Sequence, residues 1–393
     1  MLQTVAVAGY RSLRDLVVPL GRLTVVTGAN GSGKSSLYRV LRLLASTARG
    51  DAVRALATEG GFESVLWAGP ERGSRSGRPV TGTVRTGPTA VRIGFGADDL
   101  GYAVDFGLPQ LGGDSMFVRD PEIKEEVVWA GPVLRPAAVL CRRAGAGVLV
   151  REGNRWADTG RRLARQDSLL AEVADSEVAP EVLAVRNRVR SWRFYDGFRT
   201  DPEAPARGGR PGTFTPVMAD DGGDLAAALQ TVHELGYGEE LDEALDEAFP
   251  GSQLEVEDTA GLFRVRLRQP GLLRPLGAAE LSDGTLRFLL WAAALLTPRP
   301  PELFVLNEPE TSLHPDLLAP LAGMVARAAA RTQVVVVTHS AAFRQLLAGS
   351  GDGDVRNPDH DDLRDVHLVK EGGETVVAGQ GLLDRSAWHW PAR

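Results

Sequence analysis

Cysteine and lysine are scarce in this sequence of 393 residues. The single cysteine, Cys141, excludes an internal disulfide framework and a four-cysteine zinc site. Three lysines (Lys34, Lys124 and Lys370) stand against 41 arginines. Because arginine and lysine are not interchangeable at a tight anion site, a lysine kept in such a sequence indicates a position where a compact ammonium is needed.

Long apolar runs and net positive charge are also absent. The longest apolar run, Phe288–Leu296, is far shorter than the ~20 residues that cross a bilayer. The first residues do not resemble a signal peptide, so we expect a cytoplasmic protein without a membrane partner. The formal charge of −7 excludes a protein that coats nucleic acid by bulk charge, but not one with a local basic patch.

The hydrophobic pattern predicts an α/β protein. Strands are expected at Thr4–Ala8 and Leu23–Thr27, followed by a helix over Ser35–Leu44. Strand-like runs recur between about 80 and 156, and helical patterns follow at 161–174, 180–193, 223–236 and 239–248. A helix over Leu286–Leu296, a strand over Leu303–Leu306, a helix over Pro315–Ala330, a strand over Gln333–Thr338 and a hairpin over 366–377 complete the pattern. We therefore predict an N-terminal lobe over 1–160 with an antiparallel β subdomain, a helical, lid-like insertion over 161–275 and a C-terminal lobe over 276–393.

The segment Gly28–Ser35 has the P-loop pattern G-x-x-x-x-G-K-[ST], and it follows a predicted strand and opens a predicted helix. Its glycines allow successive backbone N–H groups to face an anion, and the helix N-terminus adds partial positive charge. In such a loop Lys34 reaches the β- and γ-phosphates and the Ser35 hydroxyl binds Mg²⁺. The expected nucleotide-binding residues are Asn30, Gly31, Ser32, Gly33, Lys34, Ser35 and Ser36.

A second, acidic strand is expected in a P-loop protein, and Leu303–Glu308 has the required pattern. Glu308 follows the strand at the edge where ligands bind in parallel sheets, so it is the candidate general base. Asn307 occupies the position where Asp is usual. Asparagine offers a carbonyl oxygen to Mg²⁺ but no charge, which predicts weaker Mg²⁺ binding or slower ATP turnover.

Two further segments carry candidate site residues. Ser282 and Gly284 lie in an S-D-G-T turn that opens the apolar helix before the acidic strand, where helix N–H groups can face an anion. His339 follows the buried strand Gln333–Thr338 and is expected at the same sheet edge as Glu308, as a γ-phosphate or water contact.

These motifs, in this order, resemble the ABC-type ATPase heads of the SMC/RecF/OLD-like group, and in particular stand-alone bacterial ATPases labelled "AAA family". The resemblance is most specific over residues 1–67 and 280–345. It implies binding of ATP and Mg²⁺, with Ser35 and Asn307 at the metal, and ATP-gated dimerisation of two heads. It implies that Arg11 lies near the nucleotide, that Ser282 and Gly284 serve the partner's site, that Ser312 and His314 line the seam and that His339 is a switch histidine. A Q-loop glutamine is also implied, with Gln110 as first choice and Gln166 as second.

The leading interpretation is an ATPase, slow because of Asn307, that forms a homodimer and acts in DNA repair, recombination or defence. A nucleotide-binding subunit of a transporter and a weakly hydrolysing switch for a protein partner are the alternatives. DNA is a candidate partner because Arg186, Arg190 and Arg193 share a predicted helical face among aromatics, although a buried aromatic face with paired arginines explains them better. A separately encoded nuclease or effector is a further candidate partner. Acidic clusters at 351–354 and 359–362 are expected to be loops, and Arg161, Arg162 and Arg165 a solvated helix face.

Overall fold

The computed structural model describes residues 1–69, 90–109, 116–117, 119–173, 175–349, 363–381 and 384–391. The chain forms two compact units. The first comprises Met1–Gly21, Val26–Trp192 and Arg364–Arg393, and the second comprises Arg22–Val25 and Arg193–Leu363. The division into 1–160, 161–275 and 276–393 stays a prediction.

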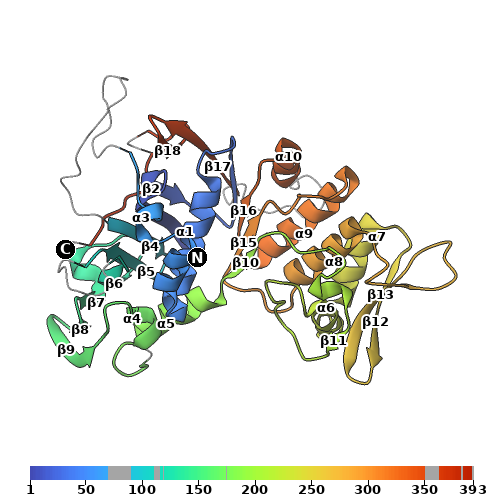
Figure 1. Ribbon diagram of the computed structural model, residues 1–393, viewed down its shortest axis with the longest axis horizontal. Helices are drawn as coiled ribbons and strands as arrows, with labels where there is room; N and C mark the ends of the chain where they lie inside the picture. Colours follow the sequence, from blue (N-terminus) through green and yellow to red (C-terminus); the bar gives the residue numbers. More distant parts are fainter. Residues whose placement is uncertain are drawn as a thin grey trace. The chain divides into compact units, whose positions relative to one another are not determined.

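An antiparallel sheet of eight strands dominates the first unit (Figure 1). Short turns join most neighbours, as antiparallel pairing allows. The left-handed Gly145 (φ 61°), for example, connects two strands at the predicted hairpin turn. In spatial order the strands are β2 (Leu13–Pro19), β1 (Leu2–Tyr10), β4 (Ala90–Ala97), β5 (Leu100–Gly107), β6 (Glu122–Ala130), β7 (Val139–Ala144), β8 (Gly147–Glu152) and β9 (Arg155–Arg162). The predicted antiparallel β lobe is confirmed.

Helix α1 (Lys34–Arg49) is the longest helix described in the first unit. Its apolar residues Leu37, Val40, Leu41 and Leu44 are buried, as their spacing predicts, and Gly50 ends the helix in the left-handed region (φ 82°). The unit also contains α2 (Ala52–Thr58), α3 (Phe62–Val65), the short helix η1 (Pro136–Ala138), α4 (Leu169–Glu172) and α5 (Pro180–Ser191).

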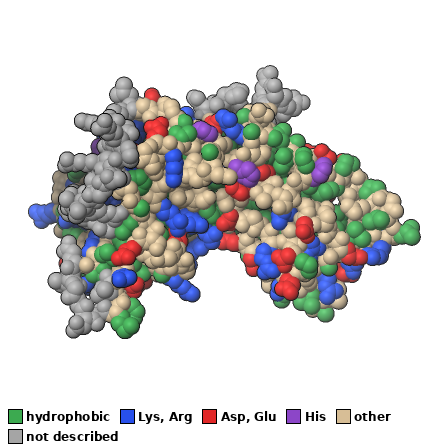
Figure 2. Space-filling model, turned by 45° about the horizontal axis from the view of Figure 1, so that its top comes forward, with side chains coloured by type: hydrophobic (Ala, Val, Ile, Leu, Met, Phe, Trp, Pro, Cys, Tyr) green, Lys and Arg blue, Asp and Glu red, His purple; other side chains and the backbone are tan. Residues whose placement is uncertain are grey.

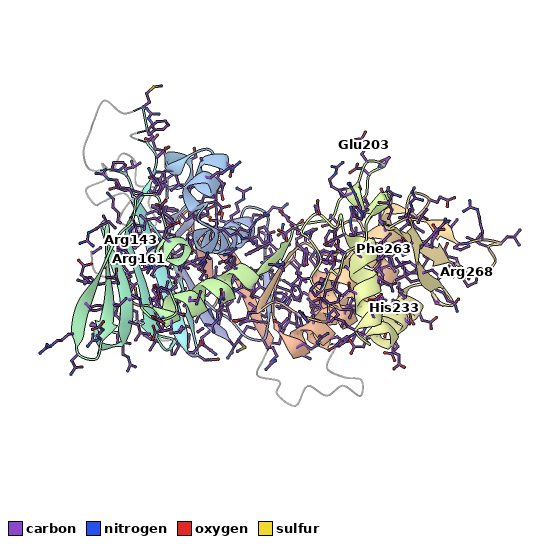
Figure 3. All side chains as sticks on the ribbon, turned by 90° about the horizontal axis from the view of Figure 1, so that it is seen from below. Arg143, Arg161, Glu203, His233, Phe263 and Arg268 are labelled. Atoms are coloured by element: carbon purple, nitrogen blue, oxygen red, sulfur yellow. The ribbon has the colours of Figure 1, made fainter. Side chains whose placement is uncertain are left out.

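The predicted helix over 161–174 is wrong. Strand β9 extends to Arg162, and only the short α4 follows. A fully buried carboxylate on β6 fixes this segment: Glu126 accepts hydrogen bonds of 2.6 Å from the Ser168 hydroxyl and the Leu169 N–H, and lies 3.4 Å from Arg143. Figure 3 shows Arg143 within the sheet. The Glu126 carboxylate thus provides an acceptor for a backbone N–H group of an irregular segment. The spacing of apolar residues does not reveal such a partner.

The predicted solvated helix face of Arg161, Arg162 and Arg165 is therefore also wrong. Arg161 and Arg162 belong to the edge strand β9, and Arg165 lies in the turn that follows. Each forms an ion pair, with Asp175, Asp158 and Glu122 respectively, at 3.0, 2.9 and 3.3 Å.

Parallel strands form the centre of the second unit. β10 (Arg193–Tyr195), β15 (Leu303–Asn307) and β16 (Gln333–Val337) lie side by side, and β15 and β16 have almost wholly buried residues, as expected of parallel strands covered on both faces. Val334 N–H donates to the Arg22 carbonyl at 2.8 Å, at the start of β3 (Leu23–Gly28). The last three residues of β3 belong to the first unit.

Helices pack around these strands, with α8 and α9 beside them in Figure 1. Helix α8 is apolar on nearly all sides and buries Trp291, which contacts the rings of Tyr195 and Phe198. The helices are η2 (Pro205–Arg207), α6 (Leu225–Glu234), α7 (Gly238–Ala248), α8 (Asp283–Leu295), η3 (Pro315–Leu317), α9 (Leu318–Arg331) and α10 (Ala341–Gly349). The helices predicted at 223–236, 239–248, 286–296 and 315–330 are confirmed within a few residues.

The middle of the chain is less helical than predicted. An antiparallel hairpin of β12 (Gln253–Thr259) and β13 (Leu262–Arg268) lies within the predicted helical insertion, with the short β11 (Arg210–Pro211) and β14 (Leu276–Gly277) beside β13. The hairpin predicted near the end is confirmed as β17 (Leu363–Glu371) and β18 (Glu374–Val377). Across the described ranges, no helix combines the length and apolar character needed to span a membrane.

Candidate active site

The P-loop of the first unit forms a tight backbone cradle between β3 and α1. Gly28, Gly31 and Gly33 all adopt positive φ angles of 147°, 75° and 110°. A Cβ added to Gly28 would lie 2.3 Å from the Leu368 carbonyl oxygen, so at this position only glycine fits the conformation and the space. The predicted strand–loop–helix context is present.

The residues around the cradle are arranged to receive an anion. The Lys34 ammonium donates to the carbonyls of Gly28 and Ala29 at 2.7 and 3.1 Å, folding back over the loop. Helix α1 has neither a side-chain N-cap bond nor an acidic residue in its first turn. The first N–H groups of any α-helix lack an intrahelical partner, and here no side-chain N-cap takes one of them, which is the condition that favours a phosphate at a helix N-terminus.

Exposure differs among the serines of the loop. Ser35 is exposed and Ser36 half-buried, whereas Ser32 is buried and its hydroxyl has no hydrogen-bond partner among the described residues. Asn30 and Gly31 are exposed at the tip of the loop. A hydroxyl and backbone N–H groups at this position fit a phosphate and an oxygen-preferring Mg²⁺ ion.

A residue far along the sequence supports this loop. The buried Thr375, at the start of β18, donates from its hydroxyl to the Ser32 carbonyl at 2.8 Å and lies against Gly33. Because a hydroxyl has a single proton, the Ser12 hydroxyl must be the donor in its 2.9 Å bond to Thr375. Sequence patterns indicated the hairpin but gave no signal of this contact.

Arg11 lies in the turn between β1 and β2 with a positive φ of 49°. Its guanidinium pairs with Glu59 at 2.8 Å, and the Tyr10 hydroxyl donates to the same carboxylate at 2.5 Å. Burial and the nearby Glu59 raise the pKa of Tyr10 well above its usual value. The structure thus places Arg11 beside an acidic partner, and the adjacent Ser12 connects to the P-loop through Thr375.

The acidic residues of the second unit meet at the ends of β15 and β16. Glu308 follows β15 with a positive φ of 48°, and its N–H donates to the Val337 carbonyl at 2.7 Å. This bond continues the pairing of β15 with β16, whereas the positive φ is a conformation that non-glycine residues rarely adopt away from functional sites. The Nδ1 atom of His339 lies 3.4 Å from a carboxylate oxygen of Glu308. The two residues are brought together as predicted.

Glu310 is a third member of this cluster whose role the sequence did not indicate. It is buried, accepts a hydrogen bond from the Thr338 hydroxyl and lies 3.8 Å from Nδ1 of His339. The Ser340 N–H in turn donates to Thr338 at 3.0 Å. These contacts hold the segment that carries His339, and the N-E-P-E spacing was the available signal.

Asn307 contacts a carboxylate from the neighbouring strand. Its amide nitrogen donates to Oδ1 of Asp196 at 2.6 Å. Asp196 follows β10, which runs parallel to β15 in register Tyr195↔Leu306, so Asp196 and Asn307 are the next pair along the two strands. The sequence pattern gave no signal of this contact.

The S-D-G-T turn opens α8, as predicted. The Ser282 hydroxyl accepts from the Thr285 N–H at 3.1 Å and so caps its own helix. A Cβ on Gly284 would lie 4.0 Å from the Ser312 carbonyl, which brings the turn and the T-S-L-H-P segment together. Ser282, Ser312 and His314 are exposed, and Ser312 has a positive φ of 62°.

The mostly buried Arg207 holds the approach to this turn. It donates to the carbonyls of Ala278 and Leu281 at 2.9 Å each and to the Asp283 carboxylate at 2.6 Å. It also donates to the Thr200 carbonyl at 2.8 Å. No motif in the sequence indicated this role for Arg207, which lies in η2.

In the arginine-aromatic segment 185–198 the aromatic side chains are buried in the core, as the preferred interpretation of the sequence predicts. Trp192, Phe194, Tyr195 and Phe198 are all at most 3% exposed, so their rings cannot stack on bases. Arg188 pairs with Asp99 at 2.7 Å. Figure 2 shows acidic and basic side chains intermixed on the face in view, without a broad field of one sign.

The two glutamines proposed for a Q-loop gain no support. Gln110 lies outside the described residues, as do the clusters at 351–354 and 359–362. Gln166 is exposed in the turn before α4.

Fold and motifs define the class as an α/β protein with a P-loop. The chain belongs to the family described as "AAA domain, putative AbiEii toxin, Type IV TA system", which matches residues 23–122 and 135–344. The predicted AAA-family ATPase fold, α/β with an antiparallel lobe, is thereby confirmed. A comparison with curated proteins gave no match.

Several solved structures of SMC heads are similar to this chain. "Crystal structure of the SmcHead bound to the C-winged helix domain of ScpA" is 12% identical with a TM-score of 0.48, over 96% of this chain and 97% of that chain. "SMC head domain from Thermotoga maritima" is 13% identical with a TM-score of 0.46, over 96% and 98%. A Pyrococcus furiosus Smc head with an extended coiled coil, bound to the C-terminal domain of ScpA, is 12% identical with a TM-score of 0.46, over 96% and 95%.

Proposed function

We propose that this AAA-domain protein binds ATP with Mg²⁺ at its P-loop and hydrolyses the bond between the β- and γ-phosphates. The cradle before α1 carries this proposal: three glycines with positive φ precede a helix whose N-terminus has no side-chain cap. The ammonium group of the buried Lys34 donates hydrogen bonds to carbonyl groups of the loop. It can donate to phosphate oxygens instead when a nucleotide is present.

Each loop residue has a defined role in this proposal. Backbone N–H groups over Asn30–Lys34 bind the phosphates, Lys34 neutralises their charge, and Ser36 adds a contact at the first turn of α1. The Ser35 hydroxyl and Asn307 hold Mg²⁺, which when bound supplies neutralisation of the β- and γ-oxygens. Arg11 contributes a further cation near the loop.

Glu308 is the proposed general base. Its carboxylate accepts a proton as water attacks the γ-phosphorus, and ADP leaves with its β-phosphate oxygen. His339, 3.4 Å from Glu308, orients this carboxylate and contacts the γ-phosphate. The unusual backbone of Glu308 supports the assignment, because strained residues concentrate where function requires a fixed side chain.

We further propose that ATP joins two copies head to head. Ser282 and Gly284 would face the partner's nucleotide, and the exposed Ser312 and His314 would line the seam. The capped and anchored α8 N-terminus beside Ser312 supports a preformed surface. Cytoplasmic action in DNA repair, recombination or defence, alone or with a separately encoded nuclease, follows from the resemblance to SMC/RecF/OLD-like heads.

A weakly hydrolysing switch is the second candidate, and Asn307 favours it. An uncharged amide at the usual Asp position predicts slower turnover with nucleotide binding retained. In this case ATP would drive dimerisation and release would reset the protein.

One experiment separates these outcomes. Steady-state ATP hydrolysis is measured for the wild type, Glu308→Gln and Lys34→Ala, with and without single- and double-stranded DNA. We expect turnover above the Glu308→Gln level and loss of nucleotide binding in Lys34→Ala. Turnover equal to Glu308→Gln with ATP-dependent dimers in light scattering would favour the switch. Failure of the wild type to bind ATP would overturn the proposal.

A further inference from the structure

The end of β15 carries a negative charge although its last residue is Asn307. The carboxylate comes from Asp196, one strand away, 2.6 Å from the Asn307 amide nitrogen. Parallel pairing of β10 with β15 fixes the two residues side by side at the edge where Glu308 and His339 also lie. The position of this pair is therefore set by the sheet rather than by a loose contact between loops.

The hydrogen bond also fixes the orientation of the Asn307 amide. A carboxylate accepts but does not donate, so the nitrogen of Asn307 must face Asp196 and its oxygen must face away from it. Asparagine thus keeps an oxygen available as a ligand while its nitrogen anchors the neighbouring acid. An aspartate at 307 could not make this contact, because two ionised carboxylates would meet at hydrogen-bond distance.

Asp196 is suited to act on a cation. It is exposed at the end of β10, and the left-handed Gly197 (φ 66°) turns the chain away directly after it. Among the described residues, its recorded partner is Asn307, and no arginine or lysine pairs with it. The nearby arginine of the same segment, Arg199, is engaged instead with Asp201 at 2.7 Å. The charge of Asp196 is therefore not neutralised locally.

We propose that Asp196 supplies the acidic group of the Mg²⁺ site that Asn307 cannot supply, with Asn307 holding it in place. The inference rests on the proposed function, because the ion would arrive with ATP. A carboxylate and an amide oxygen at one sheet edge are hard oxygen donors of the kind that Mg²⁺ prefers. In this arrangement the acidic group follows β10 rather than ending β15.

The test measures nucleotide affinity without turnover. Binding of a non-hydrolysable ATP analogue is measured by calorimetry in Mg²⁺ and in EDTA. The dissociation constant in EDTA divided by that in Mg²⁺ is the ratio that gives the Mg²⁺ contribution to binding. We expect Asp196→Asn to reduce this ratio roughly tenfold, the scale found for residues that orient or support metal ligands. The matched control is Glu203→Gln, an exposed acid in the following segment that projects from the second unit in Figure 3.

A charge swap makes the test decisive. In the double variant Asp196→Asn/Asn307→Asp the carboxylate and the amide exchange strands and can remake their hydrogen bond. We expect the Mg²⁺ contribution to return to near the wild-type value. An unchanged ratio in Asp196→Asn, an equal loss in Glu203→Gln, or no recovery in the swap would overturn the inference. Failure of the wild type to bind the analogue even in Mg²⁺ would instead count against the proposed P-loop function.

Discussion

The imidazole Nδ1 of His339 lies 3.4 Å from the Glu308 carboxylate, and the two residues come from adjacent parallel strands. The Glu308 N–H is bonded to the Val337 carbonyl, two residues before the histidine. Any shift of one strand end therefore changes the position of the other. This coupling makes the cluster sensitive to residues that never contact a nucleotide.

Glu310 should be such a positioning residue. In Glu310→Gln the acceptor for the Thr338 hydroxyl is weakened and the charge 3.8 Å from His339 is lost. We expect kcat for ATP to fall roughly tenfold or more while the dissociation constant of the nucleotide stays near the wild-type value. Glu243→Gln, which removes an exposed acid on α7, is the control and should leave kcat unchanged. Equal losses in both variants would argue against the role.

Arg207 should stabilise the turn that opens α8. Arg207→Ala leaves the carbonyls of Ala278 and Leu281 without their donor, and we expect a loss of about 2 kcal/mol in the free energy of unfolding. Urea denaturation measures it. Arg199→Ala, which breaks an exposed pair with Asp201, should change the midpoint little. Similar midpoints for the two variants would contradict this prediction.

The hydroxyl of Thr375 should contribute to nucleotide affinity. Thr375→Val keeps the shape but removes the donor to the Ser32 carbonyl, and we expect about fivefold weaker binding, near 1 kcal/mol. Thr375→Ser keeps the hydroxyl and should bind as the wild type does. If the serine variant were weaker than the valine variant, packing against Gly33 rather than the hydrogen bond would be the cause.

Asp99 should make folding sensitive to acid. Hydrogen bonds from Arg188 lower the pKa of Asp99 from its usual 3.8 to about 2. A depressed pKa in the folded state adds stability above the unfolded value, and that stability is lost as the pH falls from about 4 toward 2. Because the carboxylate is 56% exposed, the contribution should stay below about 1 kcal/mol.

Urea midpoints at pH 5 and pH 2.5 test this prediction. The difference between the wild type and Asp99→Asn should be present at pH 5 and shrink at pH 2.5. Arg188→Gln should remove the same component. A difference that does not change with pH would show that the ion pair is not its source.

Local chemistry made much of this protein predictable from sequence. Glycine spacing and a following helix located the P-loop, and apolar strands followed by polar residues located Glu308 and His339, because these patterns act through the backbone nearby. The predicted helix over 161–174 failed for the opposite reason. The partner that holds that segment, Glu126, lies on a distant strand and is buried with Arg143.

The same reason explains the contacts that sequence did not show. Asp196 meets Asn307 only because β10 pairs with β15, and strand order cannot be read from hydrophobic spacing. Thr375 reaches Ser32 only because the final hairpin lies beside the loop. In each case the sequence contained a residue type suited to the site, but the order of the strands in the fold determines which residue it contacts.

The contact between Ser32 and Thr375 joins positions 343 apart in the sequence. During synthesis the loop and α1 are made early, whereas the threonine emerges hundreds of residues later. At roughly 5–20 residues per second this delay is tens of seconds. Until then the phosphate loop lacks its supporting hydroxyl, so the growing chain should bind nucleotide about fivefold more weakly, and full affinity for ATP should appear late in translation.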